Sequence, residues 1–190
     1  MGRGPRGAPF KIAPEPELPH EMPMLTWSDE LVLDHPAMDA THEEFVALLA
    51  AAEAALAESP PTALAAYATL VEHTRAHFGQ EDRWMAETGF ARENCHSYQH
   101  AQVLELMQEV HRLARELGDF GPMQRVLPEL GKWFLVHAQS MDASLASHLD
   151  QIGHDPATGH IARPPAAQPI TGCGGKSCSP APQPGETETA

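Results

Sequence analysis

The chain has 190 residues, which is enough for one domain of ordinary size with some length left over at the ends. Its 26 acidic and 12 basic side chains give a net charge of −14 at pH 7, a sign that disfavours binding to nucleic acid and to anionic membrane surfaces. Hydrophobic residues make up 42% of the sequence, so the chain can bury a sizeable core.

Both ends of the sequence are predicted to lie outside the folded domain. Residues 1–23 are rich in proline, glycine and charge and are typical of a flexible arm, without the continuous apolar run of a signal peptide. Residues 152–190 are dominated by glycine, proline and small polar residues and predict a disordered tail with two cysteines. No stretch has the length of a transmembrane helix, so we expect a cytoplasmic protein without a membrane partner.

The region between these ends contains four helical patterns and no convincing strand alternation. The first pattern covers 37–58 and stops at the Ser-Pro-Pro segment 59–61, and Asp39 is expected to cap its start or, alternatively, to contact an imidazole. The second pattern begins after Thr62, its expected N-cap, and ends at Gly89.

The third and fourth patterns cover 92–117 and 123–149, with glycine and proline between them. Pro128 falls in the first turns of the fourth pattern, where proline costs least. Connections of only a few residues force neighbouring helices to run antiparallel. We therefore predict an all-α protein, with an antiparallel up-down-up-down four-helix bundle over residues 24–151.

Each helical pattern carries side chains that suit a metal ion. The candidates are His42 in the first pattern, His77 with Glu81 in the second, His96 with His100 in the third, and His137 in the fourth. Residues four apart share one face of a helix, and the two single histidines fall in the apolar stripes of their helices. His73 and His77 are also four apart, so spacing alone leaves alternatives open.

Asp142 is a weaker candidate on spacing. It lies five residues after His137, which places it about 140° away around an ideal helix. Imidazoles with two carboxylates are nevertheless the donors that suit a pair of non-haem iron ions between four helices. There is no HExxH motif, so nothing supports a zinc peptidase.

Four segments of the chain resemble the hemerythrin family, in particular its bacterial members. They are WSDELVLDHPAMDATHEEF from Trp27, HFGQE from His77, HSYQH from His96 and HAQSMD from His137. The resemblance spans residues 27–149 and places five histidines and two acids in the family's order, one group per helix. It also accounts for Asp142, because the family uses a carboxylate five residues after its fourth-helix histidine.

The resemblance implies a cofactor of two iron ions, Fe2+ or Fe3+, with an oxo or hydroxo bridge. It implies that His96, His100 and His137 bind one iron, that His42 and His77 bind the other, and that Glu81 and Asp142 bridge both. The second iron is then one ligand short, and dioxygen binds at that open position in the family. Trp133, Phe134, Phe45 and Phe78 are expected to line the surrounding pocket.

The chain departs from the family's pattern at three places, and none of them removes a ligand. Ala138 stands where the family usually has a bulky aliphatic residue, Asp34 where it often has glycine, and Thr41 where it often has glutamine. The small side chain of Ala138 leaves the lifetime of an oxygen adduct open.

The function expected from these residues is reversible binding of dioxygen, for storage, delivery or sensing, without enzymatic turnover. One alternative is an enzyme that acts on peroxide, nitric oxide or ferrous iron at the same site. A second alternative is an iron- or redox-sensing module that binds a protein partner through its tail. Histidine-carboxylate sites also accept manganese or zinc, so the metal is not decided by the donors alone.

The cysteines are few. Cys95, Cys173 and Cys178 do not describe a disulfide framework, and we expect a reduced protein. Cys95 is expected to pack or to face the surface without a further role. Cys173 and Cys178 form either a redox or metal-handling thiol pair or, as we expect, two unpaired cysteines in a disordered tail.

Overall fold

The computed structural model describes residues 25–90 and 95–163 of the chain. Within these two ranges the regular structure is helical, and pairing of extended segments is limited to one isolated bridge between His154 and Ile161. The predicted all-α fold is therefore confirmed. The arm expected over 1–23 and the part of the tail from 164 onward lie outside the described residues.

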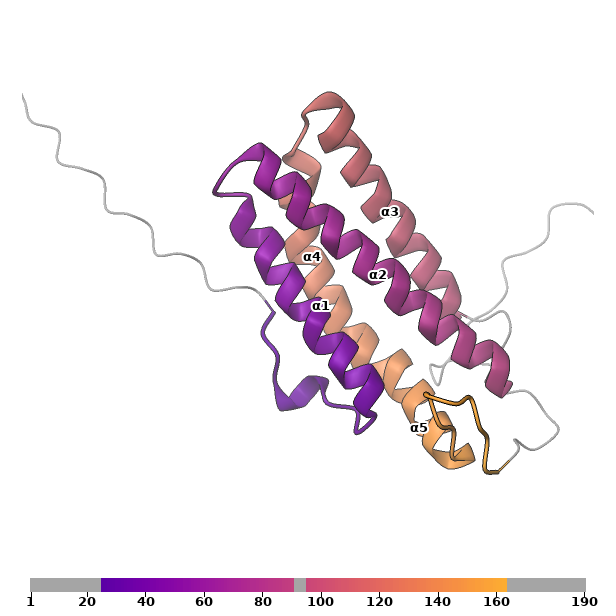
Figure 1. Ribbon diagram of the computed structural model, residues 1–190. Coiled ribbons are helices and arrows are strands. Elements are labelled where there is room, and N and C mark those ends of the chain that lie inside the picture. The colour runs from indigo at the N-terminus through magenta and orange to yellow at the C-terminus, as the bar shows by residue number, and fades with distance from the viewer. Residues whose placement is uncertain (1–24, 91–94, 164–190) are drawn as a thin grey trace, which may run out of the picture.

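Four long helical segments lie side by side and alternate in direction (Figure 1). They are α1 (Pro36–Ala55), α2 (Pro60–Thr88), α3 (Cys95–Leu117) and α4 (Gly121–His137). Two further elements, η2 (Ala138–Asp142) and α5 (Ala143–Ile152), continue α4. A short 3-10 turn, η1 (Asp29–Leu31), precedes α1. The helices close a ring in which α1 packs on α2 and α4, and α3 packs on α2 and α4. This is the antiparallel four-helix bundle that the short connections predict.

The first two helices begin at residues that the sequence patterns did not select. His35 caps α1, because its Nδ1 accepts a hydrogen bond from the backbone N–H of Met38 at 3.2 Å. The expectation that Asp39 is the cap was wrong, since its carboxylate accepts from the backbone N–H of Leu33 at 2.8 Å instead. Ser59 caps α2 in place of Thr62, because the prolines that follow Ser59 occupy the first helical positions, where a missing N–H costs nothing.

The helix ends follow the glycines. Gly89 ends α2 as predicted, and it adopts a left-handed conformation with φ of 71°. Helix α4 begins at Gly121, earlier than the pattern indicated, so Pro128 is the eighth residue of the helix and not part of its first turn. At this depth proline removes one backbone hydrogen bond from the helix interior.

The fourth helical segment changes its winding partway along. Between α4 and α5, η2 is a π-helical turn, in which the backbone N–H of Ala143 donates to the carbonyl of Ala138 five residues earlier. Two serine hydroxyls also donate hydrogen bonds to backbone carbonyls around this turn. The Oγ of Ser140 donates to the carbonyl of Val136, and the Oγ of Ser144 donates to the carbonyl of Ser140, each at 2.6 Å. A turn hydrogen-bonded over five residues brings side chains five apart onto the same face.

The apolar core has two parts. The larger cluster includes Phe45, Leu70, Met107 and Phe134, and the smaller includes Met38, Trp84, Leu145 and Leu149. Along α1, α2 and the fourth helical segment, a stretch of buried polar residues separates the positions that belong to the two clusters. The interior therefore holds a polar layer with apolar side chains on both sides of it.

The structure continues past the boundary expected at residue 151. Helix α5 ends at Gly153, which has φ of 62°, and the chain then folds back on itself. Backbone hydrogen bonds from Ala162 to the carbonyl of Gly153 and from Arg163 to that of Ile152, at 3.2 and 2.8 Å, hold the returning segment against the end of α5. We call residues 153–163 the C-terminal turn.

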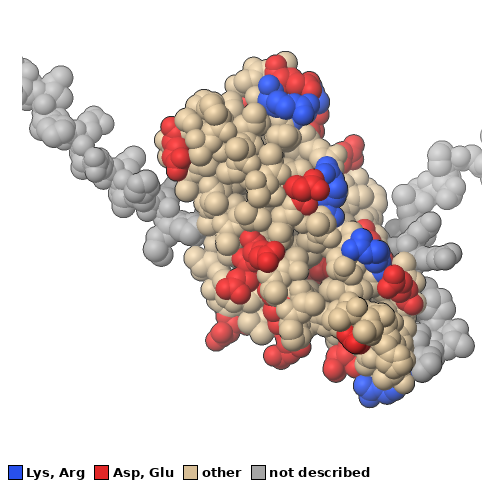
Figure 2. All heavy atoms as spheres, in the orientation of Figure 1, with Lys and Arg blue, Asp and Glu red and all other residues tan. Residues whose placement is uncertain are grey.

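The described surface is acidic in character. On the face shown in Figure 2, the basic side chains lie next to acidic ones, and further acidic side chains lie toward the end of the bundle that carries η1 and α5. Arg112, for example, pairs with both Glu109 and Glu116. None of the described helices combines the length and the apolar character needed to cross a membrane.

Candidate metal centre

Seven polar side chains meet in the middle of the bundle. They are His42 from α1, His77 and Glu81 from α2, His96 and His100 from α3, His137 from the end of α4, and Asp142 from η2. None of the seven is more than 3% exposed. The structure thus brings together every site residue named from the sequence and the resemblance, including the one that helix spacing did not favour.

Glu81 lies between two groups of imidazoles. Its Oε1 is 2.9 Å from Nε2 of His77 and 3.7 Å from Nε2 of His42. Its Oε2 faces the other way and lies 3.4 Å from Nε2 of His96 and 3.3 Å from Nε2 of His100. One carboxylate therefore presents one oxygen to the histidines of α1 and α2 and the other to those of α3.

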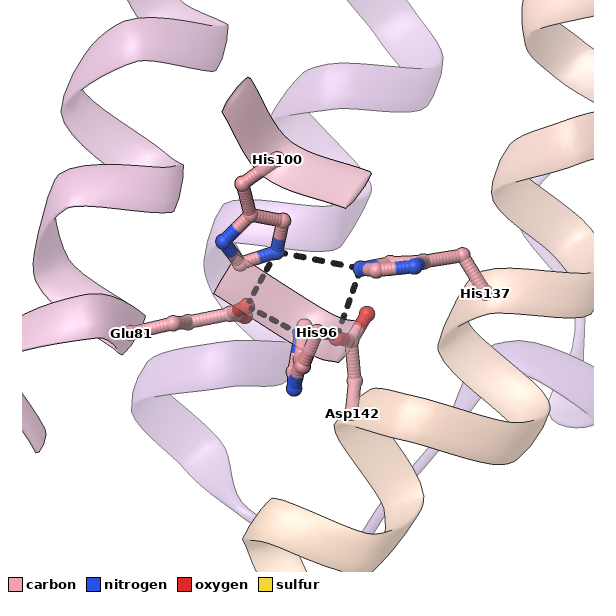
Figure 3. A group of neighbouring side chains, drawn as sticks. All are labelled: Glu81, His96, His100, His137 and Asp142. Carbon is pink, nitrogen blue, oxygen red and sulfur yellow. Dashed lines mark hydrogen bonds and ion pairs between the residues drawn. The ribbon is translucent and has the colours of Figure 1, made fainter. Parts of the chain in front are cut away.

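Asp142 divides its oxygens in the same way. Its Oδ1 is 2.9 Å from Nε2 of His96 and 3.2 Å from Nε2 of His137 (Figure 3), and its Oδ2 is 3.4 Å from Nε2 of His42. The π turn makes this possible, because it brings a residue five positions after His137 back to the face that points into the bundle.

The donor atoms form two overlapping sets. Within each set, one ligand atom per residue lies within 4.8 Å of all the others, and the sets are Glu81, His96, His100, His137 and Asp142, and separately His42, His77 and Glu81. They share Glu81. The first set contains three imidazoles and the second contains two, so two metal ions placed here would have unequal numbers of protein ligands.

The chemistry of these atoms suits cations. Several buried atoms lie within ion-pair distance of one another but do not meet hydrogen-bond geometry, namely Nε2 of His42 and His96, Oε2 of Glu81 and both oxygens of Asp142. Nitrogen and carboxylate oxygen are ligands that divalent first-row metals accept, so a cation between these atoms would compensate their burial better than the contacts that they make with one another.

Three side chains outside the cluster orient two of the imidazoles. Nδ1 of His100 is 3.1 Å from Oδ1 of Asp82, and Nδ1 of His137 is 3.3 Å from Oε1 of Gln99. The same Gln99 oxygen accepts a hydrogen bond from Nε1 of Trp133 at 3.3 Å. Asp82 and Gln99 present acceptors, so a bound cation would favour a proton on each Nδ1 and a lone pair on the Nε2 atoms of His100 and His137, which lie 3.1 Å apart.

Sequence reasoning missed Asp82 and Gln99. Each directly follows or precedes a candidate ligand in the chain, which places it off that ligand's helix face. Asp82 lies on α2 and contacts a histidine of α3, so no spacing rule within one helix could select it. The sequence signal for both residues was a polar side chain next to a candidate ligand. Polar neighbours of this kind are common on helices, so the signal does not single out Asp82 or Gln99.

Aromatic rings pack directly on the imidazoles. Phe78 stacks on His100 with ring centroids 4.0 Å apart and planes 3° apart, and Trp133 stacks on His137 at 4.4 Å. The edge contact between Phe134 and His42 has a centroid distance of 5.1 Å, and Phe45 stacks on Phe134 at 4.2 Å. Three of the four aromatic residues expected around the site, Phe78, Trp133 and Phe134, therefore restrict its imidazoles directly, and Phe45 packs behind Phe134.

The buried carboxylates and imidazoles shift one another's pKa values. Burial opposes ionisation of Glu81, but His77 and the other imidazoles outweigh it and hold the pKa of that carboxyl well below its usual range. Burial and the charge of Glu81 also disfavour ionised Asp142, yet His137 and His96 lower its pKa to about 2. Burial disfavours the charged form of His96, but Asp142 and Glu81 raise its pKa to about 9. In the metal-free protein a proton on His96 therefore balances part of the negative charge at neutral pH.

Two further histidines of the helices, one of which matched the spacing rules, do not join the cluster. His73 is half-buried, and its Nε2 lies 3.2 Å from the carboxylate of Glu44. His148 is buried with Nε2 3.2 Å from the carbonyl of Thr88. Both have partners of their own, which resolves the alternatives that spacing left open.

Comparison with known proteins agrees with this geometry. Residues 34–149 match the family model described as the hemerythrin HHE cation binding domain. The chain is 37% identical over 134 residues to a bacteriohemerythrin of Ralstonia nicotianae (strain ATCC BAA-1114 / GMI1000), a match that covers 70% of this chain and 95% of that protein. No solved structure matches the chain.

Proposed function

The chain belongs to the hemerythrin family, and from this premise we propose that its buried cluster holds two iron ions and binds dioxygen reversibly at one of them. The proposed roles are dioxygen storage, delivery or sensing, without enzymatic turnover. When bound, the iron pair supplies the electrons that make binding of dioxygen both strong and reversible. The residues of this chain supply the positions, the charge balance and the dry surroundings.

We assign the residues by the way the carboxylates face. His96, His100 and His137 hold one ion, and His42 and His77 hold the other, with Glu81 and Asp142 bridging the two. This division is supported by the distances between the carboxylate oxygens and the imidazole nitrogens, because each carboxylate turns one oxygen toward each group of imidazoles. A bridging carboxylate needs that arrangement, and a carboxylate that served only one ion would not.

The unequal number of imidazoles is the single observation that carries the dioxygen proposal. The group from α3 and α4 has three histidines, and the group from α1 and α2 has two. The second group would therefore hold its ion with one imidazole fewer than the first, which would leave room there for a further ligand. An open position beside a redox-active ion is the requirement for binding a small neutral ligand there.

The walls around the two-histidine group keep water away. His42 is fully buried against Phe134, and Phe134 is itself fully buried against Phe45. Apolar side chains lie on both sides of the polar layer. Excluding water limits loss of the bound ligand by protonation and favours reversible binding over turnover.

The test is a cycle of oxygenation and deoxygenation. The full chain is loaded with ferrous iron under nitrogen, exposed to oxygen and then evacuated, while its visible absorbance is recorded. We expect a charge-transfer band that appears with oxygen and disappears under vacuum over several cycles. Protein loaded with zinc, which has no redox chemistry, should show no band.

Two outcomes would contradict this function. One is a single, irreversible oxidation that evacuation does not reverse. The other is sustained consumption of peroxide, nitric oxide or ferrous iron by the same protein, which would assign the site to an enzyme.

A further inference from the structure

His73 lies between the buried metal centre and the surface, at the place where α1 and α2 run side by side (Figure 1). Its ring contacts the ring of His77, with centroids 6.1 Å apart, and the ring of Phe45, at 6.5 Å. On its outer side, Nε2 lies 3.2 Å from Oε2 of Glu44 on α1. The side chains of His73 and Glu44 are 14% and 71% exposed. The two residues therefore connect solvent to a proposed ligand.

The metal centre itself is closed to solvent. None of its seven side chains is more than 3% exposed, so a cation from solution has to pass other side chains before it reaches them. The ion also has to exchange bound water for protein ligands, and moving a charge into apolar surroundings without such ligands is costly. Metal-binding side chains at the surface end of the path would lower that cost.

His73 is attached to the cluster less firmly than the other polar side chains that lie beside its ligands. Asp82 lies 3.1 Å from Nδ1 of His100, and Gln99 lies 3.3 Å from Nδ1 of His137, and these contacts orient both rings. By contrast, Nδ1 of His73 and Nδ1 of His77 are buried and make no hydrogen bond within the described structure. No hydrogen bond at Nδ1 therefore prevents the ring of His73 from turning toward His77.

The outer pair of atoms has a separation that suits one ion. Metal bonds of about 2.1 Å to nitrogen and oxygen place two neighbouring ligand atoms about 3.0–3.4 Å apart, for angles between octahedral and tetrahedral. Nε2 of His73 and Oε2 of Glu44 lie 3.2 Å apart. The pair belongs to no group of three or more such ligands among the described residues, so an ion there would keep several waters and be held weakly. Weak binding suits a site that passes its ion on.

We propose that Glu44 and His73 form an entry site, which takes up a divalent first-row metal ion from solution and passes it to the buried cluster. The exposed carboxylate of Glu44 binds the ion first, together with Nε2 of His73. The ring of His73 then turns toward His77, which lies four residues later on the same face of α2 and receives the ion. The step exchanges ligands and changes no oxidation state. It rests on the metal centre of the proposed function, but not on dioxygen binding.

An entry site changes how fast metal moves and leaves the affinity of the cluster as it is. Entry and exit follow the same path, so loss of a ligand on that path raises the barrier in both directions. Loading and release should therefore slow by the same factor. A residue that only supports the cluster behaves differently, because its loss acts mainly on the rate of release and makes release faster.

The test follows cobalt(II), a divalent first-row ion whose visible absorbance reports its ligands. The metal-free full chain is mixed with excess cobalt(II) to measure loading, and the loaded chain is mixed with excess chelator to measure release. We expect Glu44→Gln and His73→Gln each to slow both rates several-fold and by similar factors. The amount of cobalt bound at saturation should not change.

Two further variants separate the entry site from general effects. Glu43→Gln removes the same charge from the neighbouring exposed position of α1 and should load and release cobalt as the wild type does. His73→Glu places another metal-binding side chain at the same position and should load faster than His73→Gln. Circular dichroism checks the fold of each variant, and Glu44→Gln, at an exposed position, carries the test if His73→Gln does not fold.

Three results would overturn the entry site while leaving the metal centre intact. They are wild-type rates in Glu44→Gln and His73→Gln, faster release without slower loading, and equal slowing in Glu43→Gln, which would assign the effect to net charge. A wild-type chain that binds no cobalt would instead contradict the metal centre, and the entry site with it.

Discussion

At the scale of single residues, Glu81 and Asp142 connect the two groups of imidazoles into one cluster. Each is fully buried and faces both imidazole groups, so removing either would leave the two groups unconnected. Buried carboxylates of this kind are stable only when charge and hydrogen-bond partners compensate their desolvation. Imidazoles supply part of that compensation in the metal-free chain, and cations would supply the rest.

Asp142 offers the sharpest test of this view. Asp142→Asn keeps the size of the side chain but removes the negative charge and one of the two acceptor oxygens. Because both oxygens contact imidazoles of different groups, we expect the variant to bind at least one iron fewer per chain than the wild type. Metal analysis after anaerobic loading measures this.

Asp150→Asn is the matched control, since Asp150 is exposed on the same helical segment. It should load as much iron as the wild type. A full iron complement in Asp142→Asn would show that Asp142 is not a ligand.

Asp82 is expected to act on the metal through His100. Asp82→Ala removes the acceptor at 3.1 Å from Nδ1 of His100, which frees the ring to adopt the other tautomer and to rotate. We expect about 10–100-fold weaker metal binding, the range found when such orienting partners are removed. A competition titration with a chelator of known affinity measures this change, and Glu105→Ala, an exposed carboxylate of α3, is the control. Equal affinity in both variants would assign Asp82 to the surface alone.

Part of this site was predictable from the sequence and part was not. His77 with Glu81 and His96 with His100 follow from helix geometry, because residues four apart share a face. The position of Asp142 does not follow from helix geometry, because the spacing rule assumes a regular α-helix and η2 is a π-helical turn. The roles of Asp82 and Gln99 depend on contacts between helices, and local spacing within one helix does not encode such contacts.

At the scale of elements, the π turn is the feature that the sequence pattern did not predict, because the pattern indicated one continuous α-helix. The sequence from Ala138 to Asp142 has no glycine or proline to mark a change in winding, and the apolar stripe continues into α5. Ser140 and Ser144, which donate to carbonyls at the turn, were the only local sign. The Ser-Pro-Pro segment separates the first two helices as predicted, and its serine also caps α2.

The C-terminal turn should weaken as the pH falls. Burial lowers the pKa of both His35 and His154, and both rings lie against Trp84, at centroid distances of 5.3 and 6.3 Å. Of the charged groups near His154, Glu87 and Asp155 favour its protonation and His148 opposes it.

The sign of the effect follows from these shifts. The folded state prefers the neutral rings, whereas the unfolded chain takes up protons near pH 6.5. The stability that depends on neutral His154 is therefore complete above pH 6.5 and declines as the pH falls below it. We expect His154→Gln to lose less thermal stability than the wild type between pH 8 and pH 5.

Thermal unfolding followed by circular dichroism at several pH values measures this difference. His160→Gln, which changes an exposed histidine of the same segment, should behave as the wild type. Parallel pH profiles for His154→Gln and the wild type would contradict the explanation.

At the scale of the whole molecule, the bundle places its charged residues in two different settings. The outer surface is acidic and solvated (Figure 2), while seven polar side chains are sealed in the interior between two apolar clusters. The negative field outside attracts cations and repels phosphate-bearing partners. The interior layer connects all four helical segments, so a bound metal pair would stabilise the folded chain as a whole by mass action.

The number of iron ions bound per chain tests the central claim most directly. The full chain, metal-free at the start, is titrated with ferrous iron under nitrogen, and bound iron is measured after removal of the excess. Two ions per chain are expected at saturation, because the five imidazoles and two carboxylates form two donor sets joined by Glu81 and Asp142. Saturation at one ion, or no retained iron, would contradict a two-iron centre in this cluster.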